Sequence, residues 1–239
     1  LQMRAMRAWF GAVDRVVAIS NFVRERLHEA SFQGVEVIHG GVTDRTPRPR
    51  LAGPPRIGFA GRLVPEKGVD VLLRACHLLR GDLPQLQLDI VGDGPALSHL
   101  RAFAEELRLG ECVTFHGKQS QPDMEQVLQR AWVQAIPSVW EEPFGLVAVE
   151  AAMRGTAAVV SGTGGLAEIV IHGKTGLHAA GGPEPLAAAL KICLENAAVA
   201  ERMGAAARLD ALARFSIDSH VQRFVDLYEG LLQAQVEKS

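Results

Sequence analysis

The chain has 239 residues, of which 48% are hydrophobic, 22% charged and 5% aromatic, and its formal net charge is −2. These totals are typical of a globular protein with one large domain, or one domain and part of another. The near-neutral charge excludes an overall basic field for nucleic acid, and no apolar run approaches the roughly 18 residues of a membrane span. Three separated cysteines, Cys76, Cys112 and Cys193, show no metal-ligand spacing and fit a reduced compartment, so we expect a cytoplasmic protein.

The first 43 residues predict only a few elements. These are a strand (14–20), a helix (21–30) capped by Ser20 and a second strand (35–42). The basic, amphipathic stretch 1–14 predicts a helix packed on a sheet, with a membrane-surface helix as the alternative. Residues 1–43 are too few for a doubly wound domain, so we expect a remnant of an amino-terminal domain and a chain that is a fragment. The proline-rich segment 44–55 predicts a linker.

From residue 56 onward, short apolar runs alternate with helical stretches. The predicted strands are 56–61, 86–92, 113–117, 133–138 and 157–162, and the predicted helices are 68–79, 95–109, 121–132 and 143–155, with helix from about Pro183 to the end. Such alternation predicts βαβ units and an α/β fold with a doubly wound, Rossmann-like parallel sheet. We assign residues 56–215 to this Rossmann-like domain and 216–239 to a carboxy-terminal helix.

In such sheets ligands bind at the carboxyl ends of the strands, where N–H groups at helix starts collect anions. The loop "AGRLVPEKG" (60–68) follows a predicted strand and opens a helix. Gly61 permits close backbone approach, and Arg62 and Lys67 together suit a diphosphate, as a bidentate fork and a point charge. The alternative is that both cations are solvated loop charges.

The stretch "EEPFGLVAVEAAMRG" (141–155) holds Glu150 in an apolar run, eight positions after Glu142. Pro143 suits a first helical turn, so the two carboxylates would lie about 12 Å apart along one helix. That length is comparable with the distance from a sugar across a diphosphate to a ribose, whose hydroxyls Glu150 would accept. Three residues would offer N–H groups to the phosphates: Phe144, Gly145 and Leu146. Alternatively, Glu142 complements the helix dipole and Glu150 pairs with an arginine.

Two glycine-rich turns have ambiguous roles. "VGDGPAL" (91–97) is similar to half of a phosphate loop, but a tight strand-to-helix turn is the safer interpretation because the third glycine is absent. In "SGTGGLAEIV" (161–170) consecutive glycines precede a short helix, and either close ligand approach or a tight turn would explain them.

Taken in order, these segments resemble the carboxy-terminal donor domain of a retaining glycosyltransferase of the GT-B fold, family four. The resemblance runs from "VVAISNFVRERL" to "FSIDSHVQRFVDLYEGLL". Its most specific element is the Glu-x7-Glu pattern in "EPFGLVAVE", supported by "GRLVPEKG" upstream and "SGTGGLAEIVIHGKTGL" downstream. The resemblance implies a glycosyltransferase that moves a sugar from a nucleotide-diphosphate sugar to a carbohydrate, lipid or small-molecule acceptor.

The resemblance also implies roles for residues. Arg62 and Lys67 would bind the diphosphate and stabilise the leaving group, Glu142 would meet the donor sugar, and Glu150 the ribose. Thr114 and Gln119 would lie where the base is held, and the backbone of Phe144, Gly145 and Leu146 beside the sugar and phosphates. Neither a metal nor a cofactor is expected. The last helix would cross back to the amino-terminal domain.

The family's pattern is not followed everywhere. Gly40 and Thr43 replace its usual Asn and Asp, and Gly162 stands where Asp is common. The missing amino-terminal domain would supply the acceptor pocket, a glycine-rich loop and an active-site His, so we expect the chain alone to be inactive. That domain is the expected partner, and through it the protein could contact the inner face of the membrane.

Two other functions stay open. The chain could be a nucleotide-sugar-binding module that needs a separate acceptor-domain chain, or a sugar-nucleotide epimerase. A hydrolytic acid pair is excluded, because the expected separation of Glu142 and Glu150, about 12 Å, exceeds the usual gap between such carboxylates.

Overall fold

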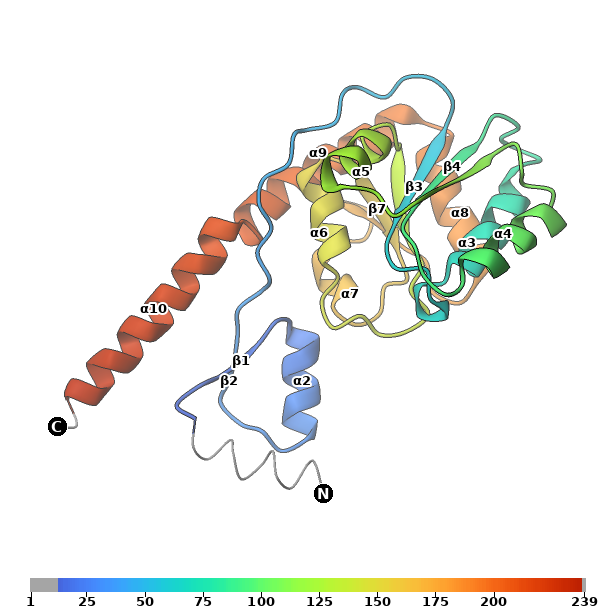
Figure 1. Cartoon of the computed structure of the whole chain (residues 1–239). Coiled ribbons are helices and arrows are strands. Elements are labelled where there is room, and N and C mark those ends of the chain that lie inside the picture. The colour runs from blue at the N-terminus through green and yellow to red at the C-terminus, as the bar shows by residue number, and fades with distance from the viewer. Residues whose placement is uncertain (1–12, 238–239) are drawn as a thin grey trace.

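A computed structural model describes residues 13–237, and its main body is a six-stranded sheet covered by helices (Figure 1). The strand order is β5-β4-β3-β6-β7-β8, and each neighbouring pair is parallel. The strands are β3 (Arg56–Ala60), β4 (Gln87–Val91), β5 (Val113–Gly117), β6 (Val133–Ile136), β7 (Ala157–Val160) and β8 (Gly176–His178). The predicted α/β fold with a parallel, Rossmann-like sheet is confirmed.

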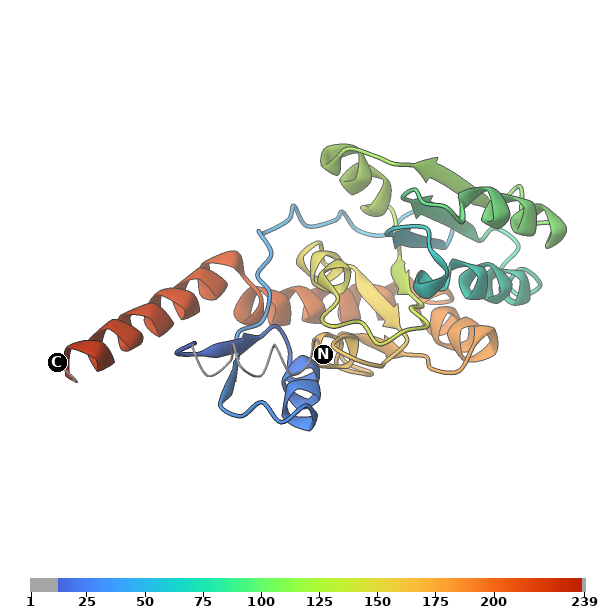
Figure 2. The ribbon, with the colours of Figure 1, turned by 60° about the horizontal axis from the view of Figure 1, so that its bottom comes forward.

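Helices lie on both faces of this sheet (Figure 2). One face carries α3 (Val69–Leu79), α4 (Leu97–Glu106) and α8 (Pro183–Leu194), and the other carries α5 (Gln121–Leu128), α6 (Leu146–Met153) and α9 (Ala197–Arg214). Because both faces are covered, β6 and β7 are buried at every position, and this is why they appear in the sequence as continuous apolar runs. In α3, residues Val69, Leu72, Leu73, Cys76 and Leu79 recur at helical spacing and face the core.

The order of the strands creates a crevice. The chain moves outward from β3 through β4 to β5, returns through α5 to place β6 beside β3, and then continues to β7 and β8. The helices that follow β3 and β6 therefore leave on opposite faces of the sheet. This is the topological switch point at which open α/β sheets bind ligands, beyond the carboxyl ends of the strands.

A small module precedes the sheet: β1 (Val16–Ala18), α2 (Asn21–Glu29) and β2 (Val35–Val37), with β1 and β2 parallel. Ser20 caps α2 as predicted, since its hydroxyl accepts a hydrogen bond from Val23 N. The predicted strand 35–42 is shorter than expected because Val42 instead hydrogen-bonds to Phe215 and Ile217. The helix expected within 1–14 lies almost wholly outside the described residues. The proposed domain boundaries stay predictions.

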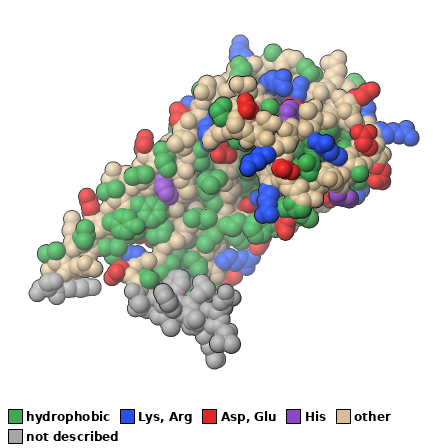
Figure 3. All heavy atoms as spheres, in the orientation of Figure 1, with side chains coloured by type: hydrophobic (Ala, Val, Ile, Leu, Met, Phe, Trp, Pro, Cys, Tyr) green, Lys and Arg blue, Asp and Glu red, His purple; other side chains and the backbone are tan. Residues whose placement is uncertain are grey.

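The last helix, α10 (Ile217–Val236), projects from the sheet alongside β1 and β2 (Figure 1). None of its side chains is buried, and Val221, Val225, Tyr228 and Leu232 form an exposed apolar stripe at helical spacing. Figure 3 shows apolar side chains gathered along this projecting rod. Within residues 13–237, no helix combines the length and hydropathy needed to cross a membrane.

Two sequence predictions need correction. The helix predicted from Pro143 begins at Leu146, because Gly145 adopts a left-handed φ of 108° at the N-cap and the preceding residues form a loop. Pro143 is therefore not in a first helical turn, and Glu142 does not lie at the mouth of that helix. The strand β8 was not predicted, because its residues Gly-Leu-His contain a single large apolar side chain and form no apolar run.

Replacing glycine by alanine at two helical positions should change the stability of the protein in opposite directions. A Cβ at Gly204 in α9 would lie 2.1 Å from the carbonyl oxygen of Gly155, whereas one at Gly230 in α10 would meet nothing within 4 Å. We expect Gly204→Ala to destabilise the protein by about 1–3 kcal/mol through overpacking. The matched Gly230→Ala should stabilise it by about 0.5–1 kcal/mol through helix propensity. Urea denaturation of both variants measures this, and equal effects would contradict the described packing of α9.

Candidate functional site

The loop after β3 is held against the loop after β4 by backbone contacts. Leu63 N donates to Asp93 O at 2.9 Å, and Ala96 N donates to Leu63 O at 3.1 Å. A Cβ at Gly92 would lie 1.9 Å from Gly61 O, so this position must be glycine. The turn "VGDGPAL" thus owes its glycines to this close approach, which supports the interpretation as a tight strand-to-helix turn.

The loops after β3 and β6 meet across the switch point. Lys67 Nζ lies 2.5 Å from Glu142 Oε1, and Ser138 Oγ donates to the same oxygen at 2.6 Å. The backbones also touch, since Val139 N donates to Glu66 O at 2.9 Å. Two residues 75 positions apart in the chain are thereby joined at the place where the fold predicts a ligand.

Glu142 is the most enclosed charged group of this site, with its side chain 9% exposed. Burial acts to raise the pKa of Glu142, but hydrogen bonds from Lys67 and Ser138 outweigh it, so the pKa lies below its usual value. The carboxylate is therefore charged at neutral pH and attracts the ammonium of Lys67. Two oxygens have room for about four hydrogen bonds, so the group retains capacity for a ligand hydroxyl.

The loop between Glu142 and α6 is braced by the glycine-rich turn after β7. Gly165 N donates to Glu142 O at 2.7 Å. A Cβ at Gly164 would lie 2.5 Å from Glu142 O, and one at Gly165 would lie 2.5 Å from the Cα of Phe144. The packing of one chain segment on another accounts for Gly164 and Gly165, a reason that the sequence analysis did not include. Close ligand approach to "SGTGG" stays a prediction.

The predicted contacts at the start of α6 are partly in place. Among residues 13–237 no side chain caps α6. Ala148 N already donates to Gly145 O at 2.9 Å, which leaves the N–H groups of Leu146 and Val147 for a ligand at the same edge of the sheet as Lys67. The ring of Phe144 is buried and stacks on His39, so only its backbone can serve a ligand. Leu146 is half exposed, at 51%.

Arg62 lies on the same loop as Lys67 and is exposed. Within residues 13–237 its guanidinium makes no hydrogen bond or ion pair, so it can turn toward an anion. Gly61 N closes the end of β3 by donating to Val91 O at 3.0 Å. A cavity of about 270 Å³ adjoins the site, lined in part by Ser138, Ser161 and Thr163.

The predicted base-binding residues are less well gathered. Thr114 lies near the beginning of β5, three residues before its end, and is exposed at the edge of the sheet. Gln119 lies beyond the end of β5, and its amide donates to His116 O at 2.6 Å. The structure places Gln119 at the carboxyl edge and Thr114 away from it, and both roles stay predictions.

Glu150 has a partner that was left unidentified from the sequence. Arg45, from the linker, donates to Glu150 Oε1 at 3.0 Å and lies 3.8 Å from Glu125. Glu125 in turn pairs with the buried Arg154 at 2.8 Å. The structure therefore shows the arginine pairing that was the alternative to a ribose contact. The ribose role stays a prediction, in which ribose would have to share or displace Arg45.

Other site residues were missed entirely. Ser138 lies two residues after the end of β6. Glu168 lies among apolar residues in "LAEIV", which is the same signal that drew attention to Glu150. Both signals were present in the sequence, but neither predicts which distant group the side chain meets. In the part of the chain that the structure describes, no group of three or more His, Cys, Asp or Glu could hold a metal ion.

These features define a class of protein. The family model for glycosyl transferases group 1 matches residues 43–210, and the chain belongs to this family. Its fold is that of the carboxy-terminal domain of GT-B glycosyltransferases, as the sequence motifs predicted.

Among curated relatives, the chain is 36% identical over 219 residues to glycogen synthase of Mycobacterium tuberculosis, an alignment that covers 87% of this chain and 52% of that protein. It is 33% identical to D-inositol 3-phosphate glycosyltransferase of Streptomyces avermitilis, with 93% and 53% covered. The chain thus spans about half the length of the curated relatives it matches.

Solved structures agree. Sucrose-phosphate synthase from Thermosynechococcus elongatus superposes with a TM-score of 0.86 at 27% identity, covering 97% of this chain and 62% of that one. Anabaena Alr3699/HepE in complex with UDP and glucose gives 0.82 at 25% identity, covering 91% and 63%.

The Lys67–Glu142 pair can be tested by titration. Lys67→Met removes the ammonium but keeps an apolar stem, so burial should dominate and the pKa of Glu142 should rise. Carboxyl-carbon NMR measures this, with the exposed Lys174→Met as control. Because the folded pKa is depressed, the stabilising effect of Lys67 should be complete above the unfolded pKa of about 4.3 and disappear as pH falls through the folded value. An unchanged Glu142 titration in Lys67→Met would contradict the pairing.

Proposed function

We propose that this chain forms the nucleotide-sugar-binding part of a retaining glycosyltransferase, with the diphosphate of the donor at the switch point between β3 and β6. One observation carries the proposal: Lys67 and Glu142 meet there at 2.5 Å, beside an uncapped helix and an exposed Arg62. A cationic loop facing free N–H groups suits an anionic ligand. A carboxylate next to the cation suits a hydroxylated group attached to that anion.

The comparisons support the donor class. UDP or UDP-glucose is named with three solved structures of Anabaena Alr3699/HepE that superpose on this chain. The curated relatives are named as a glycogen synthase and as D-inositol 3-phosphate glycosyltransferases. We therefore propose a UDP-sugar as the first donor to test and a hydroxyl-bearing carbohydrate or small molecule as the acceptor.

Each site residue has a task in this proposal. When the bond between the sugar and the diphosphate breaks, negative charge grows on the leaving phosphate. Lys67 and the N–H groups at the start of α6 are held in advance near the place where that charge develops, and Arg62 turns toward it, so that together they lower the barrier. Glu142 accepts sugar hydroxyls and holds Lys67 in place until the phosphate arrives. In this arrangement the acceptor hydroxyl attacks the anomeric carbon as the bond from that carbon to the diphosphate breaks, and its proton passes to the departing phosphate oxygen. No protein nucleophile is needed.

Removing either cation should weaken binding of the diphosphate. We expect Arg62→Ala and Lys67→Ala each to cost about 1.5–3 kcal/mol in affinity for UDP, the range of charge-assisted hydrogen bonds. Titration calorimetry measures this. Arg130→Ala and Lys174→Ala are matched controls, because both side chains are exposed and lie outside the β3 and β6 loops. If both site variants bind UDP as tightly as the wild type, Arg62 and Lys67 do not bind the diphosphate.

The two glutamates should fail in different ways. Glu142→Gln should weaken binding of UDP-glucose, because the carboxylate contacts the sugar. It should not weaken binding of UDP, because loss of the carboxylate leaves Lys67 free to bind the diphosphate. Glu150→Gln should weaken both ligands alike if Glu150 meets the ribose. Arg45→Gln is the control, since it breaks the same ion pair but leaves the carboxylate. If Glu150→Gln and Arg45→Gln lower the melting temperature equally and change neither affinity, Glu150 is structural.

A further inference from the structure

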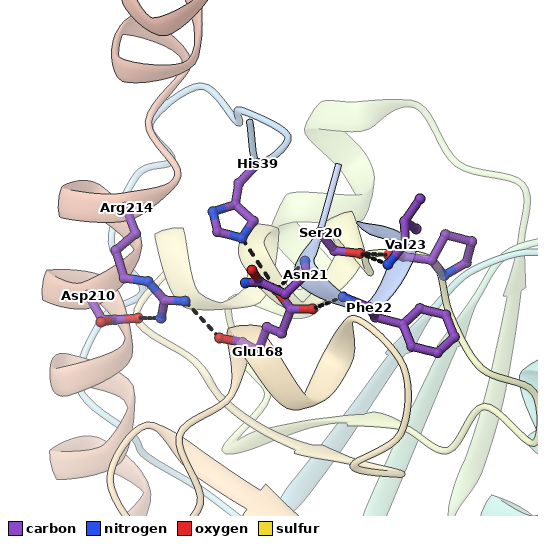
Figure 4. Close-up of polar contacts among 9 residues, drawn as sticks. Ser20, Asn21, Phe22, Val23, His39, Glu168, Asp210 and Arg214 are labelled. Carbon is purple, nitrogen blue, oxygen red and sulfur yellow. Dashed lines mark hydrogen bonds and ion pairs between the residues drawn. The ribbon is translucent and has the colours of Figure 1, made fainter. Parts of the chain in front are cut away.

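Glu168, on the short helix α7 (Leu166–Ile169), reaches across to the start of α2 (Figure 4). Its Oε2 accepts from the backbone N and the side-chain Nδ2 of Asn21, both at 2.9 Å, and its Oε1 accepts from Phe22 N at 2.6 Å. These residues are 146–147 positions apart in the chain. A carboxylate at a helix N-terminus satisfies N–H groups that have no partner within the helix and complements the helix dipole.

The hydrogen bonds that Glu168 accepts from α2 stabilise its ionised form. Its side chain is 17% exposed, and burial acts to raise its pKa. The hydrogen bonds from Asn21 and Phe22 outweigh burial, so the pKa of Glu168 lies below its usual value. The group is ionised near neutral pH, and each of its bonds to the helix is charge-assisted.

The same end of α2 is tied to the loop that follows Glu142. Ser20 Oγ donates to Pro143 O at 2.6 Å while it accepts from Val23 N at 3.0 Å. Arg26, one turn further along α2, pairs with Glu141 at 2.8 Å, although both side chains are about half exposed and this contact is worth little. The hydroxyl of Ser20 is buried and therefore the stronger of the two connections.

His39, which follows β2, extends the contact to Phe144. Its Nε2 lies 3.4 Å from Glu168 Oε2, and its ring stacks on that of Phe144 with centroids 5.7 Å apart. Gly40 adds to the fit, because a Cβ there would lie 3.1 Å from the Phe144 ring. The module of residues 14–43 thus touches Pro143 and Phe144, directly between Glu142 and the open N–H groups of α6.

We propose that Glu168 is a positioning residue that latches the start of α2 onto α7 and thereby holds Ser20 and His39 against the loop 142–146, so that docking of the module 14–43 and binding of the donor favour each other. This inference rests on the proposed function of that loop. In this loop Glu142 pairs with Lys67, and Pro143 and Phe144 contact Ser20 and His39. The backbone of Glu142 also bonds to the glycine-rich turn that precedes Glu168. Loss of the hydrogen bonds from Glu168 would free one side of this loop, whose N–H groups are proposed to bind the donor.

Coupling of this kind is reciprocal. If the latched module improves donor binding by some factor, the donor must stabilise the latch by the same factor. A purely structural Glu168 would instead lower the melting temperature, and ligand would leave exchange at α2 unchanged. Amide hydrogen exchange at Asn21 and Phe22 separates the two cases, because both N–H groups are bonded to Glu168 itself.

The experiment compares the 239-residue chain with Glu168→Gln, and with Glu36→Gln as the control, since Glu36 is exposed on β2 of the same module. In the wild type, saturating UDP-glucose should slow exchange at Asn21 and Phe22 several-fold. In Glu168→Gln, exchange at both should be at least ten-fold faster without ligand, and the Kd for UDP-glucose should rise about three- to ten-fold well below the melting temperature. Glu36→Gln should match the wild type.

A second variant guards against misfolding. Ser20→Ala removes the bond to Pro143 and the cap of α2 but leaves Glu168 intact, and it should raise the Kd in the same direction. If the wild type binds UDP-glucose, but ligand does not alter exchange at Asn21 and Phe22 and neither variant changes the Kd, the latch is wrong and the proposed function stands. If the wild type binds neither UDP nor UDP-glucose, the proposed function fails and the coupling fails with it.

Discussion

The contact between Lys67 and Glu142 is the interaction on which the site depends. It joins the loops after β3 and β6, the two strands that lie side by side although the chain visits β4 and β5 between them. A buried carboxylate without a cation would be costly, so the pair fixes both loops while no ligand is bound. In the proposed function, an anion bound here would give the ammonium a second acceptor and leave Glu142 in position for the groups that the anion carries.

Glycine makes this arrangement sterically feasible. The left-handed Gly68 presses against Pro137 O, where a Cβ would lie 2.1 Å away, and similar contacts occur at Gly92, Gly164 and Gly165. In each case one strand-end loop lies directly against another. The glycine-rich turns of this chain therefore bring loops together, and they position the side chains and helix starts that we propose as the ligand-binding groups.

The sequence was sufficient for five of the six strands of the sheet and for its main helices, because buried parallel strands appear as apolar runs and the helices have caps or periodic faces. It was also sufficient to place Lys67 and Glu142 at one edge, since strand ends in a parallel sheet meet there. It could not supply the partner of Glu150, which comes from Arg45 in an irregular linker, nor that of Glu168. Tertiary pairs between loops leave no local period, and the left-handed Gly145 that delays α6 looks in sequence like any other glycine.

The central claim is that the diphosphate of a nucleotide sugar lies at the switch point between β3 and β6, and a crystal structure of the chain with UDP tests it most directly. The account predicts phosphate oxygens within hydrogen-bond distance of Lys67 Nζ and of the N–H groups at the start of α6, with Arg62 turned toward them. Diphosphate density elsewhere, for example in the cavity lined by Ser161 and Thr163 with Lys67 still bound only to Glu142, would contradict it.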